Sequence, residues 1–471
     1  MTRTNILLAA TAGLSLTLAA WSGNSYVPTP PAPANDSTGK ELYVPAKIYR
    51  IPENNDYNNN ESEYSYKRMI QSDNIAIFWA KEFGDNPTSN ADSTKRFDPN
   101  YAIKELERFY SFYVNDLKLV QKGKSISDKY KVLLYVIGGN EGTAFGGGIE
   151  NKVGGLWTPA KRMNKAPYGA LAHELGHSFQ FLASTDNGGG PRGAIMEMSA
   201  QYMLWQVYPE WMTFENYHLN DFMKKTHFAF LHPTNMYHSP YVFEYWSNKR
   251  GIEFFGNLCR ATQQGEDPVA TYKRITNQNQ EQFNDEMYDA VSHFITWDMP
   301  RIEKVANRYA NQHTTALNTA ADGWYKIAPA RCPQNYGYNG IKLKVPAAGT
   351  KVKLDFKGIA GAEGYSQTKI DKAGWRYGFV AYKKDGTREY GKMQKTADGN
   401  TSFKVPKNTE YLWLVVMGAP TEHWAVSMGR PGGNRNNGGE APKPTPEEQW
   451  AYQFKLTGTS PDESTIAAAT N

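Results

Sequence analysis

The sequence predicts an α+β protein, with a mixed, helix-rich N-terminal part and a C-terminal β-sandwich. Two apolar runs, 73–79 and 130–137, are typical of strands in the first part. Residues 210–308 have helical periodicity. After Gly323 the pattern changes to short alternating runs with turn signals such as the Asp-Gly pair at 385–386. This succession of short strands predicts the sandwich.

Composition shifts divide the 471 residues into segments. We expect a signal peptide, a Pro-rich linker, an α+β domain, a β-sandwich domain and a flexible tail, at 1–20, 21–40, 41–320, 321–458 and 459–471. In the α+β domain a helix is expected at Tyr101–Leu119. In the sandwich, strands are expected at Ile341–Val345, Val352–Phe356, Trp375–Lys383, Ser402–Val405, Tyr411–Val416 and Trp450–Leu456.

The N-terminus has the features of an export signal. Arg3 supplies a positive charge, and Ile6–Ala20 is an apolar run too short to span a membrane. The sequence around Ala20 also resembles a bacterial lipoprotein signal, but Trp21 stands where the lipidated cysteine would be. We therefore expect a secreted, periplasmic or cell-surface protein without a lipid at this position. We expect no transmembrane segment in the rest of the chain.

Net charge and aromatic content indicate which classes of binding partner to expect. The net charge of +5 is mild for this length and the basic residues are scattered, so nucleic acid is not an expected partner. Aromatic residues make up 13% of the chain. They fit either the core of β-structure or surfaces that stack on sugars. In the sandwich, glycan contact would involve Trp375, Trp413 or Trp424; core packing is the more common role of such residues.

The chemistry is concentrated in Ala170–Leu182, which contains the H-E-x-x-H motif His173-Glu174-Leu-Gly-His177. Residues i and i+4 share a helix face, so both histidines can bind one metal ion. Glu174 can then hold a metal-bound water and take its proton. Glu197, on a second expected helix, supplies a third ligand, and three protein ligands leave one position open, as in catalytic zinc sites. The alternative is two structural histidines and a surface glutamate.

A glycine-rich segment, 142–155, directly precedes this helix. Two interpretations are equally compatible with it: an edge strand that pairs with an extended substrate, and a plain surface loop. The two cysteines, Cys259 and Cys332, are expected to be unpaired, buried thiols rather than a disulfide.

The motif and Glu197 together resemble the gluzincin class of zinc metallopeptidases, with the thermolysin-like spacing H-E-x-x-H-x19-E. Gly176 and Gln180 make His173–Gln180 similar to enhancin-like, mucin-degrading peptidases. The resemblance covers roughly His173–Gln201 and implies a zincin-like metallopeptidase domain over 41–320. It implies Zn²⁺ as the cofactor, His173, His177 and Glu197 as ligands, and Glu174 as general base.

One residue departs from that pattern. Thermolysin-like enzymes have an acidic residue four positions after the ligand glutamate, and here the position is Gln201. Gluzincins also often have a downstream Tyr or His that stabilises the oxyanion. In Tyr237-His-Ser-Pro-Tyr241 we expect His238 and Tyr241 to be candidates, and packing residues are an equally good interpretation. The other six histidines are interpreted as ordinary surface or hydrogen-bonded side chains: His218, His227, His232, His293, His313 and His423.

The expected function is that of a secreted zinc endopeptidase that acts on extracellular proteins, with glycoproteins as a candidate class. One alternative is a non-catalytic surface protein with a vestigial metal site and a glycan-binding sandwich. Another is a structural surface protein whose metal only adds stability. Structural zinc sites usually have four protein ligands, and the sequence offers three.

Overall fold

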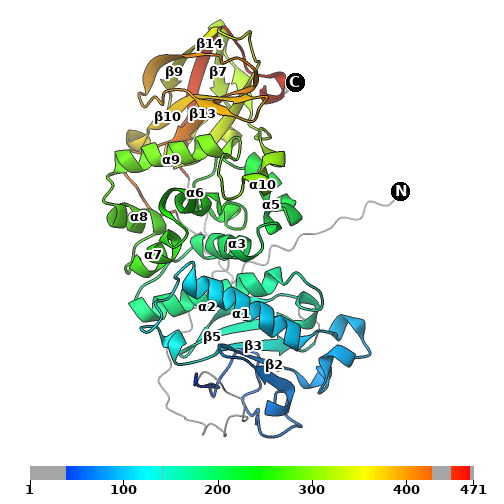
Figure 1. Ribbon diagram of the computed structural model, residues 1–471. Coiled ribbons are helices and arrows are strands. Elements are labelled where there is room, and N and C mark those ends of the chain that lie inside the picture. The colour runs from blue at the N-terminus through cyan, green and yellow to red at the C-terminus, as the bar shows by residue number, and fades with distance from the viewer. Residues whose placement is uncertain (1–38, 140–141, 427–446, 467–471) are drawn as a thin grey trace.

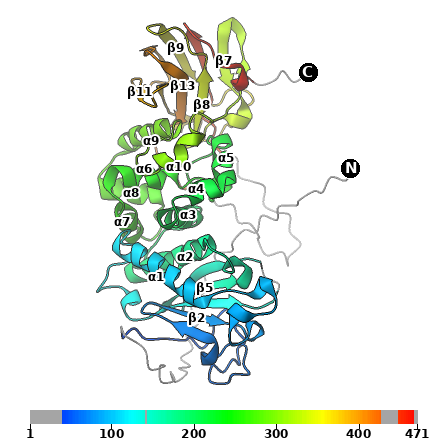
Figure 2. The same cartoon turned by 45° about the vertical axis from the view of Figure 1, so that its right-hand side comes forward.

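The computed structural model describes residues 39–139, 142–426 and 447–466. It has the α+β architecture that the sequence predicts, in three successive tiers (Figures 1 and 2). A five-stranded sheet with two long helices forms the first tier, shorter helices form the second, and two sheets form the third. The expected signal peptide, including Trp21, lies outside the described residues. Within them, no helix has both the length and the apolar character needed to cross a membrane.

The first sheet is mixed and has the order β1-β2-β3-β5-β4. Its inner strands are parallel and fully buried, which explains their continuous apolar sequences. The outer strands β1 and β4 are antiparallel to their neighbours. The strands are β1 (Met69–Gln71), β2 (Ile75–Trp79), β3 (Val132–Ile137), β4 (Phe145–Ile149) and β5 (Val153–Pro159).

Helices α1 (Pro99–Asn115) and α2 (Gly169–Asn187) pack on this sheet (Figure 1). Asp98 caps α1 by accepting hydrogen bonds from two backbone N–H groups of its first turn. The Tyr113 hydroxyl donates to the carbonyl oxygen of Ala172, 2.9 Å away, and so ties α1 to α2. The predicted apolar stripe of α2 is buried, and this leaves its histidine face turned toward the second tier.

The glycine-rich segment contains the edge strand β4, which settles the choice between strand and loop. A Cβ atom on Gly146 would lie 2.0 Å from the backbone oxygen of Glu174, and one on Gly148 would lie 2.0 Å from the ring of Phe181. Glycine is therefore needed for β4 to lie directly against α2. A Cβ atom on Gly147, between them, would meet no atom within 4 Å.

The second tier contains the helices predicted for 210–308, and α3 precedes them. Helix α9 (Gln280–Phe294) packs against the third tier. Asp285 of this helix forms an ion pair of 2.6 Å with Arg376 of the third tier. The remaining helices are α3 (Ile195–Val207), α4 (Trp211–Phe214), α5 (Asn216–Lys224), α6 (Tyr241–Arg250), α7 (Phe254–Ala261), α8 (Pro268–Thr276) and α10 (Glu303–Ala306).

The third tier contains two antiparallel sheets, with orders β11-β10-β13-β8 and β12-β9-β14-β7-β6. All six predicted strands are present; the short strands β6, β7 and β11 were not predicted. The bounds are β6 (Leu317–Thr319), β7 (Trp324–Ile327), β8 (Tyr338–Leu343), β9 (Lys351–Gly358), β10 (Trp375–Lys383), β11 (Arg388–Tyr390), β12 (Asp398–Lys404), β13 (Thr409–Gly418) and β14 (Tyr452–Thr457).

The limits of this tier differ from those expected. Strand β6 already belongs to it, so its first residues precede position 321. Residues 459–466, expected in a flexible tail, contact the sheets through bridges of Pro461 with Leu343 and of Ile466 with Leu317. Cys259 and Cys332 are buried and unpaired, as predicted.

The aromatic residues of the sandwich are mainly core. Trp375 and Trp413 are 4% and 0% exposed, so the prediction of glycan contact is wrong for both and the core interpretation is confirmed. Each indole N–H has an acceptor inside the protein: the backbone oxygen of Trp450 for Trp375, and Asn311 for Trp413. Trp424 is half-buried, with the Lys369 ammonium 3.9 Å from its ring centre.

Candidate metal centre

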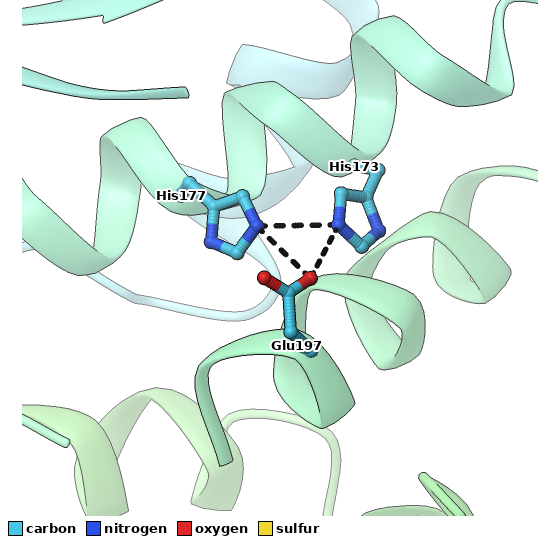
Figure 3. A group of neighbouring side chains, drawn as sticks. All are labelled: His173, His177 and Glu197. Atoms are coloured by element: carbon cyan, nitrogen blue, oxygen red, sulfur yellow. Dashed lines mark hydrogen bonds and ion pairs between the residues drawn. The ribbon is translucent and has the colours of Figure 1, made fainter. Parts of the chain in front are cut away.

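His173, His177 and Glu197 meet where α2 of the first tier faces α3 of the second (Figure 3). The Glu197 Oε2 atom lies 3.1 Å from His173 Nε2 and 3.4 Å from His177 Nε2, and the two Nε2 atoms are 3.2 Å apart. Their side chains are 13%, 12% and 18% exposed, so solvent reaches the cluster. The three side chains predicted as ligands are therefore together and could hold one metal ion.

The local sequence explains this meeting. One helical turn separates the two histidines on α2, and Glu197 is in the first turn of α3, where a negative charge is favourable. A Cβ atom on Gly176 would lie 3.4 Å from the Cα atom of Ala200 on α3. A Cβ atom there would make only an ordinary van der Waals contact, and the short distance shows that α2 packs against α3 at the residue next to His177.

Charge and hydrogen bonding hold the cluster together. Burial alone would lower the pKa of His177, but its hydrogen bond with Glu197 raises that pKa to about 9. Burial would raise the pKa of Glu197, and the two histidines instead hold it well below its usual range. Glu197 thus stays ionised and attracts positive charge to the point where the three groups meet.

Gln180 orients His177. Its Oε1 atom lies 2.9 Å from His177 Nδ1, and its Nε2 atom donates to the backbone oxygen of Met196 and to Ser199 Oγ, both at 2.8 Å. The two donated bonds fix the amide, so its oxygen must face His177. His177 therefore donates from Nδ1, and when the ring is neutral the lone pair of Nε2 faces the cluster.

Gln201 has the equivalent place beside His173. Its Oε1 atom lies 3.4 Å from His173 Nδ1, and its Nε2 atom lies 3.4 Å from His218 Nε2. Where the thermolysin-like pattern has an acid, this chain therefore has a neutral amide next to the ligand. The contact is long, and the amide itself depends on a further partner, His218.

Glu174 is half-buried next to the three donors. Burial raises the pKa of its carboxyl, and the charge of Glu197 adds to this effect, while the two histidines oppose it. A carboxyl with a raised pKa next to a metal site suits a group that takes and returns a proton.

In the segment 237–241, the two candidate oxyanion donors, His238 and Tyr241, do not face the metal cluster. Tyr241 is fully buried among Trp205, Phe222 and Trp297, so it belongs to the core and cannot reach the cluster. His238 Nδ1 faces His218 Nδ1 at 2.7 Å rather than the cluster.

Tyr237, which was not chosen from the sequence, is the residue of this segment that lies at the cluster. Its ring is stacked 6.3 Å from that of His173, and it is hydrogen-bonded with Glu197. Burial, with Glu197 next, raises the pKa of its hydroxyl, which therefore remains a donor. Its only signal in the sequence was membership of the same five-residue segment.

Comparison with known proteins supplies a family without an activity. A search of curated proteins found no match. A family model described as "Family of unknown function (DUF6055)" matches residues 34–463, which include all three tiers and the metal cluster. The chain therefore belongs to this family of unknown function.

Proposed function

We propose that this protein is an exported zinc endopeptidase of the gluzincin type, which hydrolyses extracellular proteins, glycoproteins among them. The observation that carries the proposal is the convergence of His173, His177 and Glu197 at a solvent-accessible point, with the Glu174 carboxyl within electrostatic range of all three. Three protein donors with one open side are typical of catalytic zinc sites, whereas structural zinc sites are usually closed by four.

The donor atoms fit zinc in kind and in spacing. Imidazole and carboxylate ligands of zinc lie about 2.0–2.2 Å from the ion, so tetrahedral ligand atoms are roughly 3.3–3.6 Å apart. The three separations here are 3.1, 3.2 and 3.4 Å. Gln180 and Gln201 behind the histidines are the kind of partner that fixes metal-binding imidazoles.

The side chains around the cluster have complementary roles in peptide hydrolysis. Zinc, when bound, lowers the pKa of a coordinated water and polarises a carbonyl group. Glu174 would accept the proton of the attacking water and then deliver it to the leaving amine. Tyr237 is a neutral donor beside His173 and Glu197 and would hydrogen-bond the developing oxyanion.

Strand β4 offers a way to align the substrate. It is the edge of the first sheet and lies against the helix that carries the motif. An extended peptide could pair with it by adding a strand, which would bring a peptide bond alongside α2. Pairing through the backbone tolerates many substrate sequences, as expected for an enzyme that degrades proteins.

The exposed aromatic surface close to the cluster is on α4 and α5, not on the sandwich. Phe214 and Tyr217 are 67% and 54% exposed, and the Tyr217 ring lies 4.1 Å from that of His218. Such rings bind the apolar faces of side chains or sugars. They are the proposed contact for the substrate, including the glycans of a glycoprotein.

Zinc content and peptidase activity of the full chain test the proposal. We expect about one zinc ion per chain by mass spectrometry. We also expect cleavage of casein or mucin that Glu174→Gln reduces by about 10²–10⁴-fold with zinc retained. Glu281→Gln, an exposed carboxyl on α9, is the matched control. Zinc without cleavage of any peptide library would exclude the peptidase, and a chain that does not bind zinc would exclude the whole proposal.

A further inference from the structure

A row of polar side chains extends from His173 away from the metal cluster. His173 Nδ1 lies 3.4 Å from Gln201 Oε1, and Gln201 Nε2 lies 3.4 Å from His218 Nε2. His218 Nδ1 then lies 2.7 Å from His238 Nδ1. The row therefore joins α2, α3 and α5 to the turn before α6.

The metal cluster dictates the polarity of this row. For His173 to bind a metal through Nε2, its proton must be on Nδ1. The acceptor for that proton is the Oε1 atom of Gln201, so the Gln201 NH₂ group must point the other way, toward His218. A flipped amide would present N–H to His173 and favour the tautomer that cannot bind metal through Nε2. A carboxylate at position 201 would accept in either orientation, but an amide has to be held in one.

We propose that His218 is a positioning residue for the metal site. The lone pair on its Nε2 accepts a hydrogen bond from Gln201, holds the amide in the competent orientation and thereby fixes the tautomer of His173. The proton of His218 is then on Nδ1 and is donated to His238 Nδ1. Burial is the main cause that lowers the pKa of His238, to about 4, so His238 is a neutral acceptor near neutral pH.

One group competes with this arrangement. The Glu215 Oε2 atom lies 3.5 Å from His218 Nε2 and would attract a proton to that nitrogen. Glu215 has another donor, the indole N–H of Trp211 at 2.8 Å, which lessens its demand on His218. The remaining charged groups near His238 are Asp221 and Lys225, of opposite sign. Glu215 could also act on His173 through its charge alone, and the test below separates that alternative.

The inference rests on the proposed zinc site but not on hydrolysis, so zinc affinity is the readout. We would titrate the full-length chain with zinc against a chelator. His218→Phe is expected to weaken zinc binding by about 10–100-fold, as is typical when a partner of a metal ligand is lost. His218→Gln retains an acceptor and should recover most of the affinity. His218→Lys, which has no acceptor, should give the same loss as His218→Phe and serves if that variant does not fold.

The same substitution in a second variant, Gln201→Glu, tests whether His218 acts through the orientation of the Gln201 amide. In Gln201→Glu the carboxylate accepts from His173 in any orientation, so His218→Phe should then have no measurable effect. An equal loss in both backgrounds would mean that His218 acts by packing and would overturn the proposal. Unchanged affinity in His218→Phe alone, or a similar loss in Glu215→Gln, would overturn it as well. Absence of zinc binding by the unsubstituted chain would remove the proposed function together with this inference.

Discussion

The α2–α3 junction and the C-terminal sandwich both bury polar side chains, but they arrange them differently. In the sandwich, buried donors such as the Trp450 indole and the Tyr452 hydroxyl each have a single acceptor: Trp450 donates to Asn335 at 2.9 Å and Tyr452 to Asn339 at 2.9 Å. At the junction, two ring nitrogens and a carboxylate oxygen converge on one point. Paired donors and acceptors need nothing further, whereas converging lone pairs need a cation or a proton between them. The contrast indicates which region is built for ligand binding and which for support.

The largest expected effect separates the two regions by their zinc content. Glu197→Ala removes the charged ligand and leaves two histidines, so we expect zinc affinity to fall by well over the roughly 10–100-fold that loss of an outer partner causes. Trp413→Phe removes a buried hydrogen bond to Asn311 in the sandwich and should lower the free energy of unfolding by about 1–3 kcal/mol. Zinc per chain and urea denaturation of both variants are the measurements.

The two variants should therefore differ in zinc content. Trp413→Phe is expected to retain about one zinc per chain in its folded fraction. In a chelator Glu197→Ala also loses its hydrogen bond with His173 and its charge interaction with His177, so some loss of stability is expected, and zinc content is the measurement that separates the two variants. If Glu197→Ala retained full zinc, or Trp413→Phe lost it, the division between a ligand-binding and a supporting region would be wrong.

The grouping of His173, His177 and Glu197 could be predicted because it follows from helical spacing. The i, i+4 relation of His173 and His177 and the helix that carries Glu197 are local patterns, so the cluster could be predicted without the fold. The long strands of the three sheets are likewise visible in the sequence, whereas β6 and β11 have three residues each, too few to show a period.

The residues that depend on tertiary packing could not be predicted. Tyr237, His238 and Tyr241 lie within five positions, yet they face the cluster, His218 and the core, respectively. No periodicity assigns directions within such a turn. The contact between Gln201 and His218 could not be predicted either, because His218 is on another helix and nothing in its local sequence marks it.

Acidification should lower the free energy of unfolding, because an imidazole is buried at the base of the sandwich. His313 is 5% exposed, with its Nε2 atom 2.8 Å from the Tyr338 hydroxyl, and burial lowers its pKa from 6.5 to about 3. Between these two pH values His313 binds a proton in the unfolded chain but not in the folded chain. This contribution is fully present above pH 6.5 and is lost as the pH falls toward 3, by at most about 1.4 kcal/mol per pH unit.

Urea denaturation of the chelator-treated protein at pH 7 and pH 5 would measure this slope. His313→Gln should reduce the loss of stability on acidification, and the half-buried His293→Gln is the matched control for removal of an imidazole elsewhere. Glu197→Ala should leave the contribution of His313 in place, since the two residues are in different regions. An unchanged slope in His313→Gln would show that this imidazole does not carry the acid sensitivity.

Two neighbouring glycines on β4 test how closely the edge strand packs against α2. In Gly146→Ala the new Cβ atom would meet the backbone oxygen of Glu174 at 2.0 Å, and a backbone atom cannot rotate away. We expect a loss of about 1–3 kcal/mol in unfolding free energy, because the strand or the helix must shift. Gly147→Ala meets no atom within 4 Å and should change stability by less than about 0.5 kcal/mol. Because the first substitution displaces the residue that carries the proposed general base, it should also lower peptidase activity, with zinc affinity changed less. Equal stability of the two variants would mean that β4 is not held against α2, and the proposed alignment of substrate along this strand would lose its structural basis.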